Sequence, residues 1–143
     1  MKRISIKNNK GFTLLELMIV VTIVAVISVS ALPIFVDKII RDQVKEGLTL
    51  AESVKEVVYT YTNAHAQTFP IDNTEAGFPG LKGEFVASVE IVDGAIISTF
   101  GNNANLIIKD KHLTLTPTTT TGTYISWKCT FDGDVKFAPY ICK

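Results

Sequence analysis

A single acidic side chain stands in an otherwise uncharged stretch near the amino terminus of this 143-residue chain. The 25 residues from Phe12 to Val36 carry one charged group, Glu16. A carboxylate in an apolar layer is costly unless a cation pairs with it, and two such charges attract strongly there. Cleavage before Phe12 would create an α-ammonium group of the required sign. The alternative is an ordinary boundary residue, because Glu16 lies about one helical turn from Phe12 and could reach an aqueous interface.

Two cysteines, Cys129 and Cys142, flank a short polar loop near the carboxyl terminus. Two ligands alone are too few for a metal site, so we predict a disulfide if this part is exported, with free thiols as the alternative. Closing this loop would contribute about 3 kcal/mol on the chain-entropy model. Asp132 and Asp134 could touch a calcium ion, but the full calcium-loop pattern is missing, which favours solvated turn residues.

Motifs for catalysis are absent from the sequence. His65 and His112 are the only histidines, and we interpret both as structural. The chain has no glycine-rich phosphate loop, no His-Glu-x-x-His motif and no recognisable triad. We therefore expect no enzyme activity, no cofactor and no metal.

The apolar stretch from Phe12 to Val36 has the length of a membrane span. As a helix it would measure about 37 Å, against about 30 Å for the hydrocarbon core of a bilayer. It is too long for a secretory signal, no small-residue cleavage site follows it, and an acid lies near its start. A plain single-span anchor remains the alternative.

The charges are distributed unevenly along the chain. Residues 1–11 hold four basic side chains and no acidic one, which leaves 10 basic and 14 acidic side chains in the remainder, a net charge of −4. Such a remainder has no overall field to attract nucleic acid, although a local basic patch stays possible. The apolar content of 47% excludes a disordered polymer.

An amphipathic pattern continues the apolar stretch, and together they predict one helix from Phe12 to about Ala64. Pro33 is expected to kink or locally melt this helix because it lacks an N–H group and its ring crowds the preceding turn. The stripe expected to pack on a core consists of Ile40, Val44, Gly47, Ala51, Val54, Val58 and Tyr61.

A loop at residues 67–83, rich in Pro and Gly, separates this helix from four strand signals. These cover Glu84–Val92, Ala95–Phe100, a strand around Leu113 and Leu115 that ends at Pro117, and Thr123–Cys129. Asp93-Gly94 predicts a two-residue hairpin turn, and the threonine run at residues 118–121 with Gly122 predicts a polar turn. The expected core-facing residues are Phe85, Ala87, Val89, Ile91, Leu113, Leu115, Ile125, Trp127 and Cys129. The prediction is an α+β fold in which the long helix packs on a four-stranded antiparallel meander.

The segment Lys10-Gly11-Phe12-Thr13-Leu14-Leu15-Glu16-Leu17-Met18 resembles the processing and assembly motif of type IV pilins. The resemblance implies that a membrane peptidase removes a leader of residues 1–11 by cutting after Gly11. It also implies that the new terminal Phe12 is N-methylated. Glu16 would then neutralise the terminal amine of a neighbouring subunit during filament assembly.

The likeness extends over almost the whole chain. It implies a long helix at residues 12–65, partly unwound before Pro33, and a head at residues 66–143 that ends in a Cys129–Cys142 disulfide loop. One departure concerns the helix, because the family often has glycine where this chain has Ala25.

The resemblance implies a structural subunit, a major pilin of the shorter-leader class, that polymerises into type IV pili of a Gram-negative bacterium. The precursor would sit in the inner membrane before it joins the pilus at the cell surface. Its partners would be identical subunits, the peptidase that also methylates it, and an assembly machinery powered by cytoplasmic ATPases. Adhesion, twitching motility and DNA uptake would be properties of the filament. The alternatives are a minor pilin or a type II secretion pseudopilin, and a single-span membrane-anchored binding module.

Overall fold

The computed structural model describes residues 11–119 and 124–143. Most of the predicted leader, the later part of the threonine-rich turn and the predicted strand start at Thr123 lie outside these residues. The chain forms two units, Met1–Val36 and Asp37–Lys143. Helix α1 (Leu14–Ala64) contributes to both units, and all four strands belong to the second. From here on we call this second unit, Asp37–Lys143, the head, so that it includes the second part of α1.

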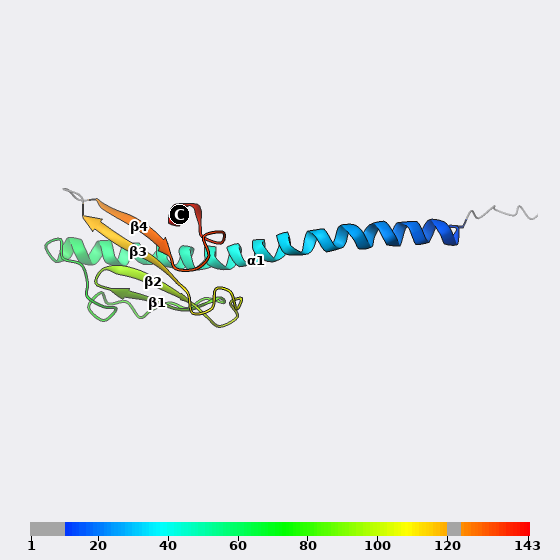
Figure 1. The fold of residues 1–143 in the computed structure, drawn as a ribbon. Coiled ribbons are helices and arrows are strands. Elements are labelled where there is room, and N and C mark those ends of the chain that lie inside the picture. The colour runs from blue at the N-terminus through cyan, green and yellow to red at the C-terminus, as the bar shows by residue number, and fades with distance from the viewer. Residues whose placement is uncertain (1–10, 120–123) are drawn as a thin grey trace, which may run out of the picture. The chain divides into compact units, whose positions relative to one another are not determined.

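The sheet of the head is an antiparallel meander in the order β1-β2-β3-β4 (Figure 1). Its strands are β1 (Val86–Val92), β2 (Ala95–Phe100), β3 (His112–Thr119) and β4 (Ile125–Phe131), and a short 3-10 turn, η1 (Tyr140–Cys142), follows them. Asp93 and Gly94 form the predicted β1–β2 turn, both with positive φ. The predicted α+β fold with a long amino-terminal helix and a four-stranded meander is confirmed.

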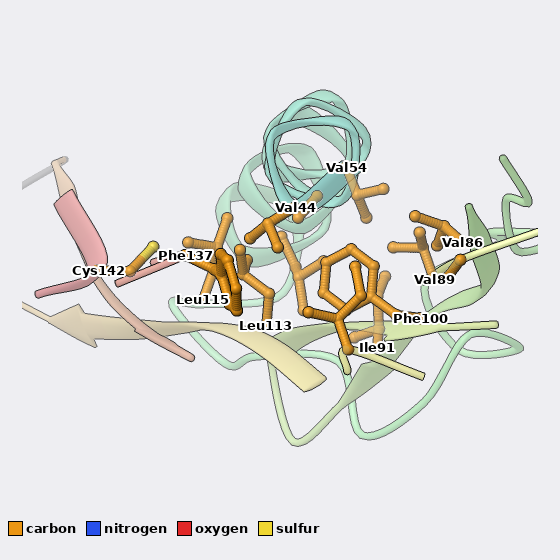
Figure 2. Close-up of a cluster of buried hydrophobic side chains, with 14 of the residues drawn as sticks. Val44, Val54, Val86, Val89, Ile91, Phe100, Leu113, Leu115, Phe137 and Cys142 are labelled. Atoms are coloured by element: carbon orange, nitrogen blue, oxygen red, sulfur yellow. The ribbon is translucent and has the colours of Figure 1, made fainter. Parts of the chain in front are cut away.

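The core of the head lies between the sheet and the part of α1 that follows Asp37 (Figure 2). The predicted helical stripe is confirmed from Ile40 to Val58, whose large side chains are at most 1% exposed. Gly47 lets the helix approach β2, because a Cβ atom there would lie 2.5 Å from the Phe100 ring. One member differs, since Thr62 is buried and Tyr61 lies half-buried at the edge of the stripe.

The core face of β1 differs from the prediction at its start. Val86 is fully buried, whereas Phe85 and Ala87 are only half-buried. The pairing between β1 and β2 shifts register between Val86 and Ser88, and such a bulge reverses the alternation of side chains. Beyond the bulge, Val89 and Ile91 face the core as predicted.

Strand β3 continues past Pro117, where the sequence predicted its end. Pro117 is paired with Trp127 of β4, while the last residue of β3 paired with β2 is Leu115. The missing N–H group of proline therefore costs no ladder bond to β2. Ile125, Trp127 and Cys129 share one face of β4 as predicted, where they are half-buried, and the strand extends to Phe131.

The segment at residues 67–83 is a loop, as predicted, and it runs along the outer edge of β1. Isolated bridges join Asp72 to Val92 and Leu81 to Val89. This contact covers the edge of the sheet that β1 would otherwise expose.

Candidate functional site

The first turn of α1 brings together the residues of the predicted processing and assembly motif. Gly11, Phe12 and Thr13 precede the helix, which begins at Leu14. The Thr13 hydroxyl accepts a hydrogen bond of 3.2 Å from the Glu16 N–H, and the Thr13 carbonyl accepts one of 3.1 Å from the Leu17 N–H. Thr13 is therefore the N-cap of α1. Sequence reasoning missed this role, although Thr-x-x-Glu before an apolar run is a capping signal.

Glu16 is exposed on this first turn. Its carboxylate forms no hydrogen bond or ion pair with any residue of the described parts of the chain. Glu16 lies in the first turn of α1, at the positive end of the helix dipole. Glu16 is thus held in position through its backbone while its carboxylate remains available to a cation from outside the chain.

The first unit exposes the whole apolar stretch that surrounds Glu16. The large apolar side chains from Phe12 to Val36 have exposed fractions between 44% at Val36 and 83% at Phe12. In the head, by contrast, Ile40 is fully buried. Hydrophobic surface of this extent marks a site for lipid or for another protein.

Two hydroxyl groups within the apolar stretch donate to carbonyl groups of the same helix. The Thr22 hydroxyl donates to the Met18 carbonyl, and the Ser28 hydroxyl donates to the Val24 carbonyl at 2.7 Å. Bonds of this kind remove the cost of placing a hydroxyl in a layer without water. Glu16 is the one charged residue of the stretch.

Pro33 lies inside α1. In the described residues, no single helix meets the length and hydropathy criteria for a membrane span, but the segments Leu14–Val29 and Leu32–Ala64 meet them as a pair separated by a break. The predicted span at residues 12–36 falls across that break.

The predicted disulfide between Cys129 and Cys142 is present and ties β4 to η1. Asp132 and Asp134 serve as turn residues inside the loop that it closes. Asp132 Oδ1 accepts the His112 N–H at 2.6 Å, and Asp134 Oδ1 accepts the Lys136 N–H at 2.9 Å. Among the residues described by the structure, no three His, Cys, Asp or Glu side chains are grouped to hold a metal ion.

The two histidines lie in separate local contacts. The His65 ring stacks on the Tyr61 ring with 3.9 Å between centroids, and His112 Nδ1 lies 3.1 Å from Thr99 Oγ1. Both histidines are exposed and far apart in the chain, at the end of α1 and the start of β3.

A polar network, which the sequence did not reveal, fastens the end of α1 to the loop at residues 67–83. The Tyr61 hydroxyl donates a 2.5 Å hydrogen bond to Glu75 Oε1, and the Ile71 N–H donates one of 2.6 Å to Oε2. Donation from the Ile71 backbone, and then from Tyr61, lowers the pKa of the Glu75 carboxyl. The hydrogen bond to Glu75 in turn raises the pKa of the Tyr61 hydroxyl.

Comparison with protein families gives two matches that together cover most of the chain. Residues 41–143 match the pilin family, described as a bacterial filament protein. Residues 6–32 match the prokaryotic N-terminal methylation motif, which contains Gly11, Phe12 and Glu16.

Curated relatives resemble the chain over nearly its full length. A fimbrial protein of Neisseria meningitidis serogroup A is 40% identical over 133 residues, 90% of this chain and 71% of the relative. The type IV major pilin protein PilE of Neisseria gonorrhoeae is 39% identical over 90% of this chain and 72% of its own length. The fimbrial protein EcpC of Eikenella corrodens is 34% identical, over 94% and 91% respectively. With a capped apolar helix, a four-stranded head and these matches, the chain belongs to the pilin family.

Proposed function

We propose that the chain is a structural subunit that polymerises into type IV pili on the bacterial surface. The observation that carries this function is the Glu16 carboxylate, which has no partner among the described residues and lies on an exposed apolar helix inside the methylation motif. The relatives are named as fimbrial proteins and type IV major pilins, which supports the bulk subunit of a filament. A minor pilin or a type II secretion pseudopilin would be a trace component of such a fibre.

We propose that processing cuts the bond between Gly11 and Phe12 and that Phe12 is then methylated. Gly11 and Phe12 are exposed and precede the helix, so a peptidase could reach this bond without unwinding α1. The methylation motif supports a membrane-anchored precursor, which we place in the inner membrane of a Gram-negative cell. The peptidase and the assembly machinery would be its partners there.

The new ammonium group of Phe12 would pair with Glu16 of a neighbouring subunit. Both charges would lie in an apolar, low-dielectric layer, where their attraction is strong and an unpaired charge is costly. The pair would therefore fix the register of neighbouring helices. Dense packing of the apolar surfaces from Phe12 to Val36 would supply the rest of the stabilisation, as between helices in membranes.

Adhesion, twitching motility and DNA uptake would be activities of the assembled filament. They depend on the surface that the heads present together and on the machinery that extends and retracts the fibre. Adhesion and motility are consistent with membership of a family of bacterial filament proteins.

Mass spectrometry of the chain from sheared surface fibres tests the proposal. We expect it to be the dominant protein and to begin at a methylated Phe12. As a matched change, Gly11→Val should leave the leader attached and abolish fibres. A Cβ atom at Gly11 would meet nothing within 4 Å, so the structure has room for a side chain to begin there. Fibres built from chains that still begin at Met1 would contradict the proposal.

A further inference from the structure

Two adjacent aliphatic side chains are exposed in one loop at one end of the head. Leu106 is 84% exposed and Ile107 is 53% exposed, both in the loop between β2 and β3. We call this pair the apolar tip. Adjacent large aliphatics in water are unfavourable, and an exposed apolar patch often marks a contact with a membrane or another protein.

The loop that carries the apolar tip is firmly anchored. Ile108 is fully buried in the core directly behind the tip. Gln43 Oε1 accepts the Asn105 N–H at 2.9 Å, and Asn105 Oδ1 accepts the Ile107 N–H at 3.0 Å. The fold therefore holds Leu106 and Ile107 outward, and their exposure does not arise from a loose connection.

The apolar tip lies at the end of the head where α1 enters it. The antiparallel meander places the β2–β3 loop and the segment after β4 at the same end of the sheet (Figure 1). Gln43 of α1 holds the β2–β3 loop through its hydrogen bond with Asn105. Asp37 of α1 holds the segment after β4 through an ion pair with Lys136 at 3.2 Å. Asp37 is bonded directly to Val36, the last residue of the apolar stretch.

We propose that the apolar tip inserts into the headgroup region of the bilayer that holds the unassembled precursor. This inference rests on the proposed function, because it requires residues 12–36 to be in a membrane before assembly. A bilayer that holds a segment ending at Val36 begins within a few residues of Asp37, so it is the first apolar phase that this end of the head meets.

The charges around the apolar tip fit a zwitterionic phospholipid surface. Lys109 and Asp110 follow the tip in the same loop, and Lys136 and Asp37 lie on neighbouring segments, so both signs are present. Headgroups that carry a phosphate and an ammonium group can pair with both. The aliphatic pair protrudes and would enter a deformable layer directly, whereas a second copy of the chain would need a matching pocket.

Fluorescence quenching in vesicles tests this contact with the full chain. Trp127 is the only tryptophan, so Trp127→Phe gives a dark background for new reporters. Leu106→Trp reports on the tip, and Ile71→Trp is the matched control because Ile71 is 65% exposed. Ile71 lies at the opposite end of the sheet, where its carbonyl accepts the Asp93 N–H of the β1–β2 turn. Val24→Trp reports on insertion of the apolar stretch.

In phosphatidylcholine vesicles with brominated lipid, we expect the reporters at positions 24 and 106 to lose most of their emission. The reporter at position 71 should lose little. Quenching at position 24 with none at position 106 would overturn the lipid contact and leave the proposed function intact. Quenching at neither position would overturn both. The tryptophan at position 106 could instead stay exposed to solvent in vesicles and become buried only in assembled fibres. That result would also overturn the lipid contact, and would assign the apolar tip to a second copy of the chain.

Discussion

Glu16 is exposed on the first turn of α1, and its carboxylate has no partner within the described chain. Thr13 caps the helix through the Glu16 backbone, so the geometry of the acid is fixed while its charge stays unpaired. If the apolar stretch lies in a layer without water, its one carboxylate needs one cation to pair with it. A free amino terminus at Phe12 meets that requirement only when the leader has been removed.

Glu75 is the residue in the head whose protonation is expected to affect stability. Hydrogen bonds from the Ile71 N–H and the Tyr61 hydroxyl lower the pKa of its carboxyl in the folded state. A group with a lowered folded pKa contributes stability above its unfolded pKa of about 4.3 and loses that contribution as the pH falls through the folded pKa.

Tyr61→Phe removes one of these donors, and we expect a lower thermal unfolding midpoint at neutral pH. The difference from the wild type should shrink as the pH falls below about 4, because the Glu75 carboxyl is then protonated in the unfolded and finally in the folded state. Thermal unfolding of the detergent-solubilised chain across this pH range measures it. A difference that stayed constant down to pH 2 would show that the Tyr61 hydroxyl stabilises the head independently of the charge on Glu75.

The helix and the sheet of the head are in close contact at Gly47. A Cβ atom there would lie 2.5 Å from Cζ and 2.7 Å from Cε1 of Phe100. The Ser98 hydroxyl donates to the Gly47 carbonyl at 2.9 Å and fixes the same contact. The small residue therefore sets the distance at which α1 and β2 pack.

Gly47→Ala is expected to destabilise the head by about 1–3 kcal/mol through overpacking against Phe100. In an unobstructed helix the same change would stabilise by about 1 kcal/mol, so the sign of the effect identifies the cause. Urea unfolding of the single variant, of Phe100→Leu and of the double variant measures the coupling. Leucine at position 100 has no ring and should relieve the clash with alanine at position 47, so the double variant should lose less stability than the sum of the two single changes. Additive losses would refute the overpacking explanation.

The Cys129–Cys142 disulfide acts on the end of the sheet. It joins two cysteines separated by 13 positions and holds the carboxyl-terminal segment against β4. Replacing both cysteines by serine should lower the free energy of unfolding by about 3 kcal/mol on the chain-entropy model. Reductant should destabilise the wild type to a similar extent and leave the double variant unchanged. A reduced wild type as stable as the oxidised one would contradict this role.

Local periodicity was sufficient to predict the main elements. The stripe from Ile40 to Val58, the Asp93-Gly94 turn and the Leu113–Leu115 face all follow from residue spacing, because each is determined by neighbours in sequence. The bulge at Val86 depends on pairing between β1 and β2, and no local pattern indicates which strand carries the extra residue. The same holds for the hydrogen bond from the Asn105 N–H to Gln43, which joins residues 62 positions apart.

At the scale of the whole molecule, the two units differ in how they satisfy their apolar surface. The head buries its stripe and sheet face in one core that includes Val44, Phe100 and Leu113. The first unit exposes its large apolar side chains along the full stretch from Phe12 to Val36. A chain with a buried core in the head and an exposed apolar segment in the first part of α1 is suited to insertion in a bilayer and then to packing against copies of itself. The sequence predicted this division from composition alone, whereas the apolar tip at Leu106 and Ile107 required the structure.

The yield of sheared surface fibres from cells that make only Glu16→Val tests most directly whether Glu16 pairs with the terminal amine of a neighbouring subunit. Under our proposal, cleavage depends on Gly11 and packing depends on the Glu16 carboxylate. We therefore expect a chain that begins at Phe12, remains in the membrane and gives no fibres. Leu17→Val, which places the same side chain one position further on, should be processed and should still form fibres. Normal fibre yield from Glu16→Val would show that no pairing with the terminal amine holds the subunits together.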